Sequence, residues 1–240
     1  SLTRIGTRPG RRYDERQMET RRELRREFLA MVARRQRPGT GSMLSALDVR
    51  RIVMDWWSEV EHALHGIPYA VAGAVATNAY APERLTQDID IVVLTGTTAV
   101  AEAALRDAGW RMVGSLSLIE GTSWKDAAGH DLDVIALAEP WAVEGVNAAQ
   151  DNRVVGMPTL PLPYLVLMKM QAARTTDLGD VSRMLGREDD AHVEVARGVV
   201  KRFGNADDVA DFEQLVRMGR LERERGEAGE KGEAPGDTPI

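Results

Sequence analysis

The chain has 240 residues, 43% of them hydrophobic and 28% charged, a length and composition that allow a buried core. It has no cysteine, which excludes a disulfide scaffold, a cysteine nucleophile and a thiolate metal site, and its formal net charge is −6. No apolar run approaches the roughly 20 residues of a membrane-spanning helix, so we expect a soluble, cytoplasmic protein with no membrane partner.

The first predicted unit is a basic N-terminal extension and linker, residues 1–42. It holds twelve arginines against five acidic residues, so the rest of the chain is strongly acidic. Residues 14–36 show a thin apolar stripe at helical spacing, and residues 37–42 (RPGTGS) have linker composition. The basic arm favours an anionic partner such as RNA; the alternative is a solvated helical extension.

Residues 43–140 alternate between helix and strand patterns, which favours a small mixed β-sheet domain of α/β (α+β) class. Helical spacing and β-branched runs locate its elements. The predicted helices are 46–65, which Gly66 ends, 76–80 and 98–108. The predicted strands are 68–73, 88–94, 111–121 and 131–137, with a turn at Gly129-His130.

Residues 141–221 are predicted to form a helical domain, because amphipathic patterns dominate after about residue 140. The predicted helices are 140–150, 162–185, 191–203 and 207–224, and one short strand is expected within 153–160. Glycine and glutamate enrichment from Arg225 onward predicts a disordered tail, residues 222–240.

The strand at 88–94 (DIDIVVL) carries two carboxylates on one face. Side chains alternate along a strand, so Asp88 and Asp90 share a face, while Ile89, Ile91 and Val93 make the other face wholly apolar. Two like charges at this spacing repel, and their burial without compensation costs several kcal/mol each. A divalent cation relieves both costs, and Mg²⁺ prefers carboxylate oxygens together with substrate phosphates.

The strand at 131–137 (DLDVIAL) repeats this arrangement with Asp131 and Asp133. Placed beside the first strand, it supplies a third carboxylate, and three carboxylates on adjacent strands fit a two-metal phosphoryl-transfer site. We favour Asp133 because it lies deeper in the apolar run. Asp131, nearer the turn, is the alternative.

Gly73-Ala74 lies where the strand at 68–73 passes into a helix. A glycine there lets backbone N–H groups approach a phosphate, which the helix N-terminus favours. Helix–strand packing explains the glycine equally well.

The segment VAGAVATNAYAPERLTQDIDIVV resembles the signature of the DNA polymerase β-like nucleotidyltransferase superfamily. That signature is an apolar strand, a Gly-Gly or Gly-Ser turn, a short helix and Arg-x-Thr-x-Asp-x-Asp, which here reads Arg84, Thr86, Asp88 and Asp90. Ala74 departs from it, because the usual second Gly or Ser is absent and with it a hydroxyl that often touches the triphosphate. The resemblance implies that Gly73, Ala74, Arg84 and Thr86 contact the nucleotide.

The segment MKMQAARTTDLGDVSRML is similar to the Lys-x₄-Arg-x₂-Asp-x₂-Asp helix of the abortive-infection, toxin-type (type IV toxin–antitoxin) nucleotidyltransferases. As one helix it places Lys169, Asp177 and Asp180 in one sector, a polar stripe instead of a core stripe. Lys169 is then placed to meet nucleotide phosphate. Arg174, Asp177 and Asp180 are expected to lie at the nucleotide, with Asp177 and Asp180 binding the acceptor, positioning Lys169 or acting as base, and Arg174 pairing with Asp177 or contacting phosphate. The alternative is a solvated helix face with internal salt bridges.

Together these residues predict a Mg²⁺-dependent enzyme that moves a nucleoside monophosphate from ATP or another NTP to an acceptor hydroxyl. Asp88, Asp90 and Asp133 would hold two Mg²⁺ ions, with Asp133 helping to deprotonate the acceptor, while Lys169 and Arg84 neutralise phosphate charge. The acceptor is expected to be RNA, such as a tRNA 3′ end. The alternatives are a protein hydroxyl, a small molecule such as an aminoglycoside, and a non-catalytic nucleotide-binding module of the same fold.

Overall fold

The computed structural model describes residues 57–81, 89–117, 119–154 and 156–232. The extension at 1–42 and three predicted site residues, Arg84, Thr86 and Asp88, lie outside these ranges.

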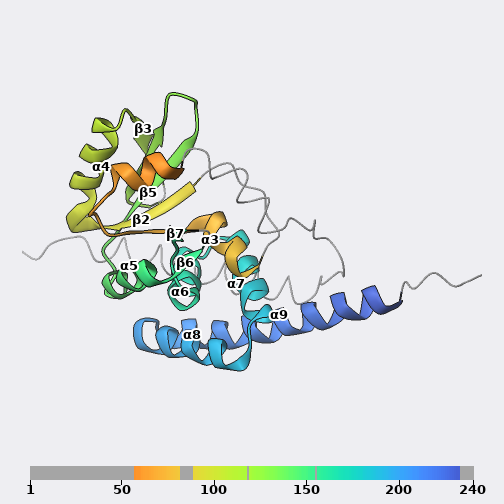
Figure 1. Ribbon diagram of the computed structural model, residues 1–240. Helices are drawn as coiled ribbons and strands as arrows, with labels where there is room; N and C mark the ends of the chain where they lie inside the picture. Colours follow the sequence, from red (N-terminus) through yellow and green to blue (C-terminus); the bar gives the residue numbers. More distant parts are fainter. Residues whose placement is uncertain (1–56, 82–88, 118, 155, 233–240) are drawn as a thin grey trace, which may run out of the picture.

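A five-stranded mixed sheet forms the N-terminal part of the described chain, with strand order β1-β2-β5-β4-β3 (Figure 1). The central strand, β5, runs parallel to its neighbour β2, and the other neighbours are antiparallel. The strands are β1 (Tyr69–Val71), β2 (Ile89–Leu94), β3 (Arg111–Ser115), β4 (Gly121–Lys125) and β5 (Asp131–Leu137). A small separate hairpin pairs β6 (Arg153–Val154) with β7 (Met157–Pro158).

Helices cover both faces of the sheet and continue into a bundle at the C-terminal end (Figure 1). Residues 57–63 are also helical, and Gly66, with φ +79°, follows them. None of the described helices combines the length and apolar character that crossing a membrane requires. The helices are α3 (Gly73–Tyr80), the 3-10 turn η1 (Thr95–Thr97), α4 (Thr98–Asp107), α5 (Ala142–Asp151), α6 (Leu162–Ala172), α7 (Thr175–Arg187), α8 (Asp190–Phe203) and α9 (Ala206–Gly232).

The sheet separates two apolar cores, one on each face. β2 contributes to both cores, because its side chains alternate between the two faces as predicted for 88–94. Ile89, Ile91 and Val93 pack with residues 57–64 and with α4. Val92, on the other face, packs with α5, α6 and α7. The face of β2 that carries Asp90 is therefore the one turned toward the helical part of the chain.

The single strand expected at 111–121 is wrong, because this stretch folds back as the hairpin of β3 and β4. Apolar Leu116 and Ile119 continue the strand pattern through the turn and conceal it. Gly121 opens β4 at a close approach, since a Cβ there would lie 2.3 Å from the Val134 carbonyl oxygen. The hairpin adds β4 to the sheet beside β5.

The single helix expected at 162–185 is also wrong. α6 ends at Ala172, Ala173 takes the left-handed conformation with φ +53°, and Arg174 is the extended N-cap of α7. The β-branched Thr175 and Thr176 that follow have low helix propensity, which favours a new start at this point. The chain bends here, so α6 and α7 are separate helices that pack against each other.

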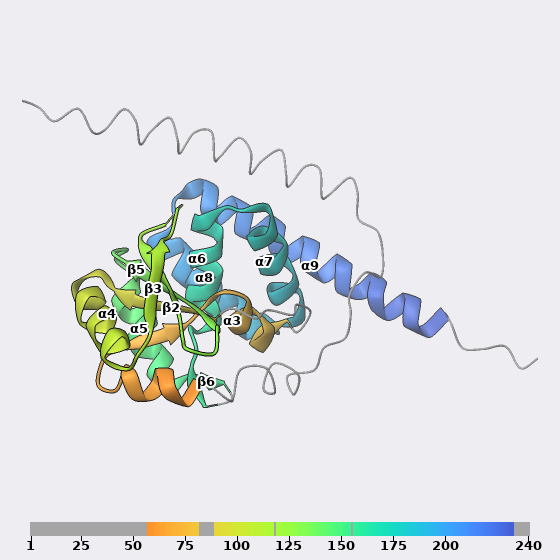
Figure 2. The same cartoon turned by 90° about the horizontal axis from the view of Figure 1, so that it is seen from above.

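The disorder expected over residues 222–240 is wrong as far as Gly232, because α9 continues to that residue. Figure 2 shows this end of α9 reaching past the body of the molecule. The glutamate, arginine and lysine residues of this stretch have good helix propensity, which outweighs its scattered glycines. Residues 233–240 lie outside the described chain.

α7 and α9 cross at two glycines, Gly186 and Gly219. A Cβ on Gly219 would lie 1.9 Å from the Ser182 carbonyl oxygen, and one on Gly186 would lie 2.4 Å from Gly219 backbone atoms. The crossing therefore has no room for a side chain and fixes α7 close to α9.

We expect Gly219→Ala to lower the free energy of unfolding by about 1–3 kcal/mol, because the added methyl forces two packed backbones apart. Urea unfolding followed by circular dichroism measures the change. The matched control is Gly198→Ala in α8, where a Cβ meets nothing within 4 Å. Helix propensity predicts a gain of about 1 kcal/mol there, and a gain at Gly219 as well would contradict the close crossing.

Candidate active site

Two carboxylates from neighbouring strands lie side by side on the sheet. Asp90 of β2 and Asp133 of β5 are direct partners in the parallel register of these strands. Both are partly buried, and both belong to the face that turns toward the helices α5, α6 and α7. Because partners in a parallel pair project to the same face, the two acids leave the sheet on one face and at one level.

Gly73 provides the space that Asp90 occupies. Gly73 begins α3 with φ +57°, and a Cβ at this position would lie only 1.7 Å from Asp90 Oδ2. The Ala72 N–H donates a 2.8 Å hydrogen bond to the Asp90 carbonyl oxygen, which holds the strand against this turn. A side chain at residue 73 would fill the position of the carboxylate. Ala74 follows in the first turn and brings no hydroxyl to it.

β4 contributes a polar neighbour to Asp133. Ser123 is its register partner and donates a 2.6 Å hydrogen bond from Oγ to Asp133 Oδ1. No sequence motif marks Ser123, because it lies in the strand that the hydrophobic pattern did not predict. The sequence feature that indicates Ser123 is the alternation in GTSWK, which places Ser123 and the buried Trp124 on different faces of β4.

The two aspartates of β5 have different partners. Asp131 forms an ion pair with Lys125, whose Nζ lies 2.7 Å from Oδ1 and 2.8 Å from Oδ2. Asp133 forms no ion pair with a described residue, although it lies beside the carboxylate of Asp90. Among the described residues, Asp131 therefore has a cationic partner and Asp133 has none.

The bend between α6 and α7 assembles a buried group of charges. Lys169 Nζ donates to Asp177 Oδ1 at 3.1 Å and to Asp180 Oδ2 at 2.8 Å. All three side chains are at most 7% exposed, so the polar stripe expected on one helix is instead a contact between two helices. Burial of an ionic group is tolerated when every charge is paired and hydrogen-bonded, as here.

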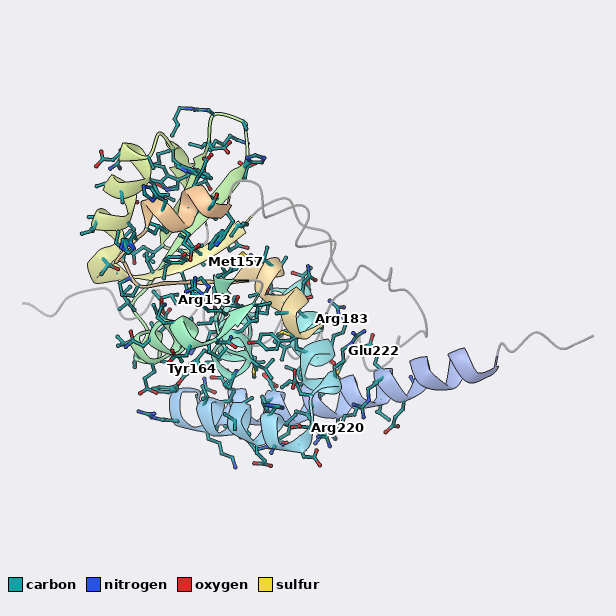
Figure 3. All side chains as sticks on the ribbon, viewed as in Figure 1. Arg153, Met157, Tyr164, Arg183, Arg220 and Glu222 are labelled. Carbon is teal, nitrogen blue, oxygen red and sulfur yellow. The ribbon has the colours of Figure 1, made fainter. Side chains whose placement is uncertain are left out.

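Two arginines complete this group of charges. Arg183 of α7, labelled in Figure 3, binds Asp180. Arg174 donates from Nε to Asp177 Oδ2 at 2.6 Å, and its side chain is 62% exposed. The hydrogen bond to Asp177 raises the pKa of Arg174, and the negative charges of Asp177, Asp90 and Asp180 raise it further against the opposing effect of burial. The charge of Asp90 thus acts on Arg174, which links the sheet carboxylates to the α6–α7 bend.

The described part of the chain supplies two of the three predicted metal-binding carboxylates. Within it, no three histidine, cysteine, aspartate or glutamate side chains gather into a group that would hold an ion alone. Asp88, the third member of the predicted set, lies outside it, as do Arg84 and Thr86.

Comparisons with known proteins find likeness at the level of structure only. No family model matches, and no curated protein matches. A crystal structure from H. pylori described as a nucleotidyltransferase is 14% identical with TM-score 0.40, covering 78% of this chain and 97% of its own. The antibiotic-resistance factor ANT(2'')-Ia is 18% identical with TM-score 0.39, covering 77% and 97%.

Terminal uridylyl transferase 4 from Trypanosoma brucei with bound GTP is 13% identical with TM-score 0.33, covering 70% of this chain and 57% of its own. At these identities the likeness concerns the fold alone.

Proposed function

We propose that this chain is a metal-dependent nucleotidyltransferase of the DNA polymerase β-like superfamily, which moves a nucleoside monophosphate from an NTP to a hydroxyl group and releases pyrophosphate. The observation that carries the proposal is the pairing of Asp90 with Asp133 on one face of the sheet, beside the Gly73 turn. The effect of the Asp90 charge on the pKa of Arg174 supports it, because it means that a cation lies near this acid.

The acid pair suits a hard divalent cation. Asp90 and Asp133 are adjacent carboxylates on neighbouring strands, and Gly73 leaves the space that the first of them needs. Asp88, Asp90 and Asp133 would hold two Mg²⁺ ions in this proposal. Bound there, Mg²⁺ supplies charge stabilisation for the triphosphate and for the transferring phosphoryl group.

The residues of the chain divide the remaining work. Asp133 accepts the proton of the acceptor hydroxyl as the oxygen–phosphorus bond forms and pyrophosphate leaves. Gly73, Ala74, Arg84 and Thr86 contact the nucleotide. In this proposal Lys169 neutralises phosphate charge, and Asp177 and Asp180, which accept hydrogen bonds from its ammonium group, hold it in position. Arg174 is their exposed cation and meets the triphosphate, as in other phosphoryl-transfer sites that balance phosphate charge with arginine.

RNA is the acceptor that we propose, as in the toxin-type relatives that the Lys169 segment resembles. The arginine-rich arm at 1–42 supports it, because clustered arginine favours a polyanion. A protein hydroxyl and an aminoglycoside are the competing acceptors.

The test is to incubate the full chain and Mg²⁺ with each of four labelled NTPs and one acceptor class at a time: total RNA, cell protein or an aminoglycoside panel. We expect label on RNA, and none when Mg²⁺ is chelated. Label on protein or aminoglycoside instead would refute RNA as the acceptor and support nucleotidyl transfer as the reaction. If no acceptor class is labelled and calorimetry detects no NTP binding, the proposal that this chain is a nucleotidyltransferase is refuted.

A further inference from the structure

We propose that Ser123 is a positioning residue for Asp133 and fixes which carboxylate oxygen faces the metal and the acceptor. The inference rests on the proposed function, and nothing in the sequence motifs assigns a role to this serine. It begins from a row of three residues on three adjacent strands: Ser123 of β4, Asp133 of β5 and Asp90 of β2 are successive register partners.

The hydrogen bond from Ser123 gives the two carboxylate oxygens of Asp133 different roles. Ser123 Oγ donates to Oδ1 at 2.6 Å, a short distance that is typical of a hydroxyl bound to a charged carboxylate. Oδ2 has no hydrogen bond within the part of the chain that the structure describes. The carboxylate therefore cannot rotate without giving up the serine, and Oδ2 is the oxygen that remains for a metal or a proton.

The position of Ser123 makes this orientation rigid. β4 is paired on both sides, with β5 and with β3, so the serine backbone is held by two ladders. Trp124, the next residue, is fully buried on the opposite face and anchors the strand. A carboxylate supported from a regular strand keeps its geometry better than one supported from a loop.

The other hydroxyl of β4 shows that this contact is particular to the site. Thr122 lies on the opposite face, where it donates to Glu102 at 3.0 Å and accepts from Trp124 Nε1 at 2.9 Å. Both hydroxyls contact an acidic side chain, but only that of Ser123 is directed at the row of acids. Thr122→Val is therefore a matched control.

The experiment measures Mn²⁺ affinity by electron paramagnetic resonance, and the kcat and KM of nucleotidyl transfer, in the full-length chain. Loss of a group that orients a metal ligand weakens metal binding or activity about 10–100-fold. We expect Ser123→Ala to weaken Mn²⁺ binding and lower kcat by that factor while the KM for NTP stays within about twofold. Ser123→Thr keeps the hydroxyl and restores both.

Thr122→Val should leave Mn²⁺ affinity and kcat as in the wild type, even if it lowers the unfolding midpoint. Unchanged Mn²⁺ affinity in Ser123→Ala overturns the role of Ser123 and leaves the proposed function intact. Failure of Ser123→Thr to restore binding also overturns it. If the wild-type chain itself binds no Mn²⁺, the proposed function falls, and this inference with it.

Discussion

Replacement of Asp90 by asparagine is expected to lower nucleotidyl transfer by at least about a thousandfold, which corresponds to about 4 kcal/mol of activation free energy. Asp90 is the acid that touches the Gly73 turn, pairs with Asp133 and acts on Arg174. Asparagine keeps the shape and removes the charge, so the loss reports electrostatic stabilisation in the transition state. Transfer from labelled NTP under single-turnover conditions measures it.

Asp131→Asn is the control for this substitution. It removes a carboxylate from the same sheet face, but one that Lys125 already neutralises. We expect activity within a few fold of the wild type, and circular dichroism should show both variants folded. Equal loss of activity in the two variants would mean that the choice of Asp133 over Asp131 is wrong. Full activity of Asp90→Asn would refute the proposed metal site.

Asp180→Asn is expected to lower the free energy of unfolding by about 3–5 kcal/mol. Asp180 is fully buried and accepts from both Lys169 and Arg183, so its neutralisation takes one negative charge away from two cations at a buried position. A buried ion pair that loses one partner usually costs this much, even where the intact pair adds little. Urea unfolding, fitted with a common slope for both proteins, gives the difference.

Asp190→Asn provides the matched comparison, because Asp190 also pairs with an arginine, Arg220, which Figure 3 labels on α9. The Asp190 side chain is 87% exposed, and exposed pairs contribute at most about 1 kcal/mol. A similar small loss for both variants would contradict the importance of burial for the Lys169 group.

The sequence predicts the fold best where side chains alternate strictly between the two faces of a strand. In β2 the alternation of aspartate with isoleucine assigns each residue to a face, and the two cores of the structure follow that assignment. The repeated Asp-x-Asp in 131–137 identifies a second strand of the same kind. The sequence does not predict that β2 and β5 pair directly with Asp90 beside Asp133, because long-range packing determines which strands are neighbours.

The features that the sequence does not predict, the bend between α6 and α7 and the role of Ser123, have local causes. Ala173 is the best helix-forming residue type, yet it takes the left-handed conformation between α6 and α7, so no propensity argument finds the bend. The pairing of Lys169 with Asp177 and Asp180 nevertheless occurs, across two helices where one had been expected. Ser123 was missed because the apolar residues before it hid the turn that begins β4.

The order of strands has a consequence for how the acidic pair comes into being. β1 and β2 form one antiparallel pair, with α3 between them in the chain, and β3, β4 and β5 form another unit of consecutive strands. Within the described sheet, the parallel pairing of β2 with β5 joins the two units. Asp90 belongs to the first unit, and Asp133 with Ser123 to the second. Neither half of the sheet holds both acids, so a nascent chain acquires the pair only when β5 docks against β2. Local opening between these two strands would separate the acids before the rest of the protein unfolds.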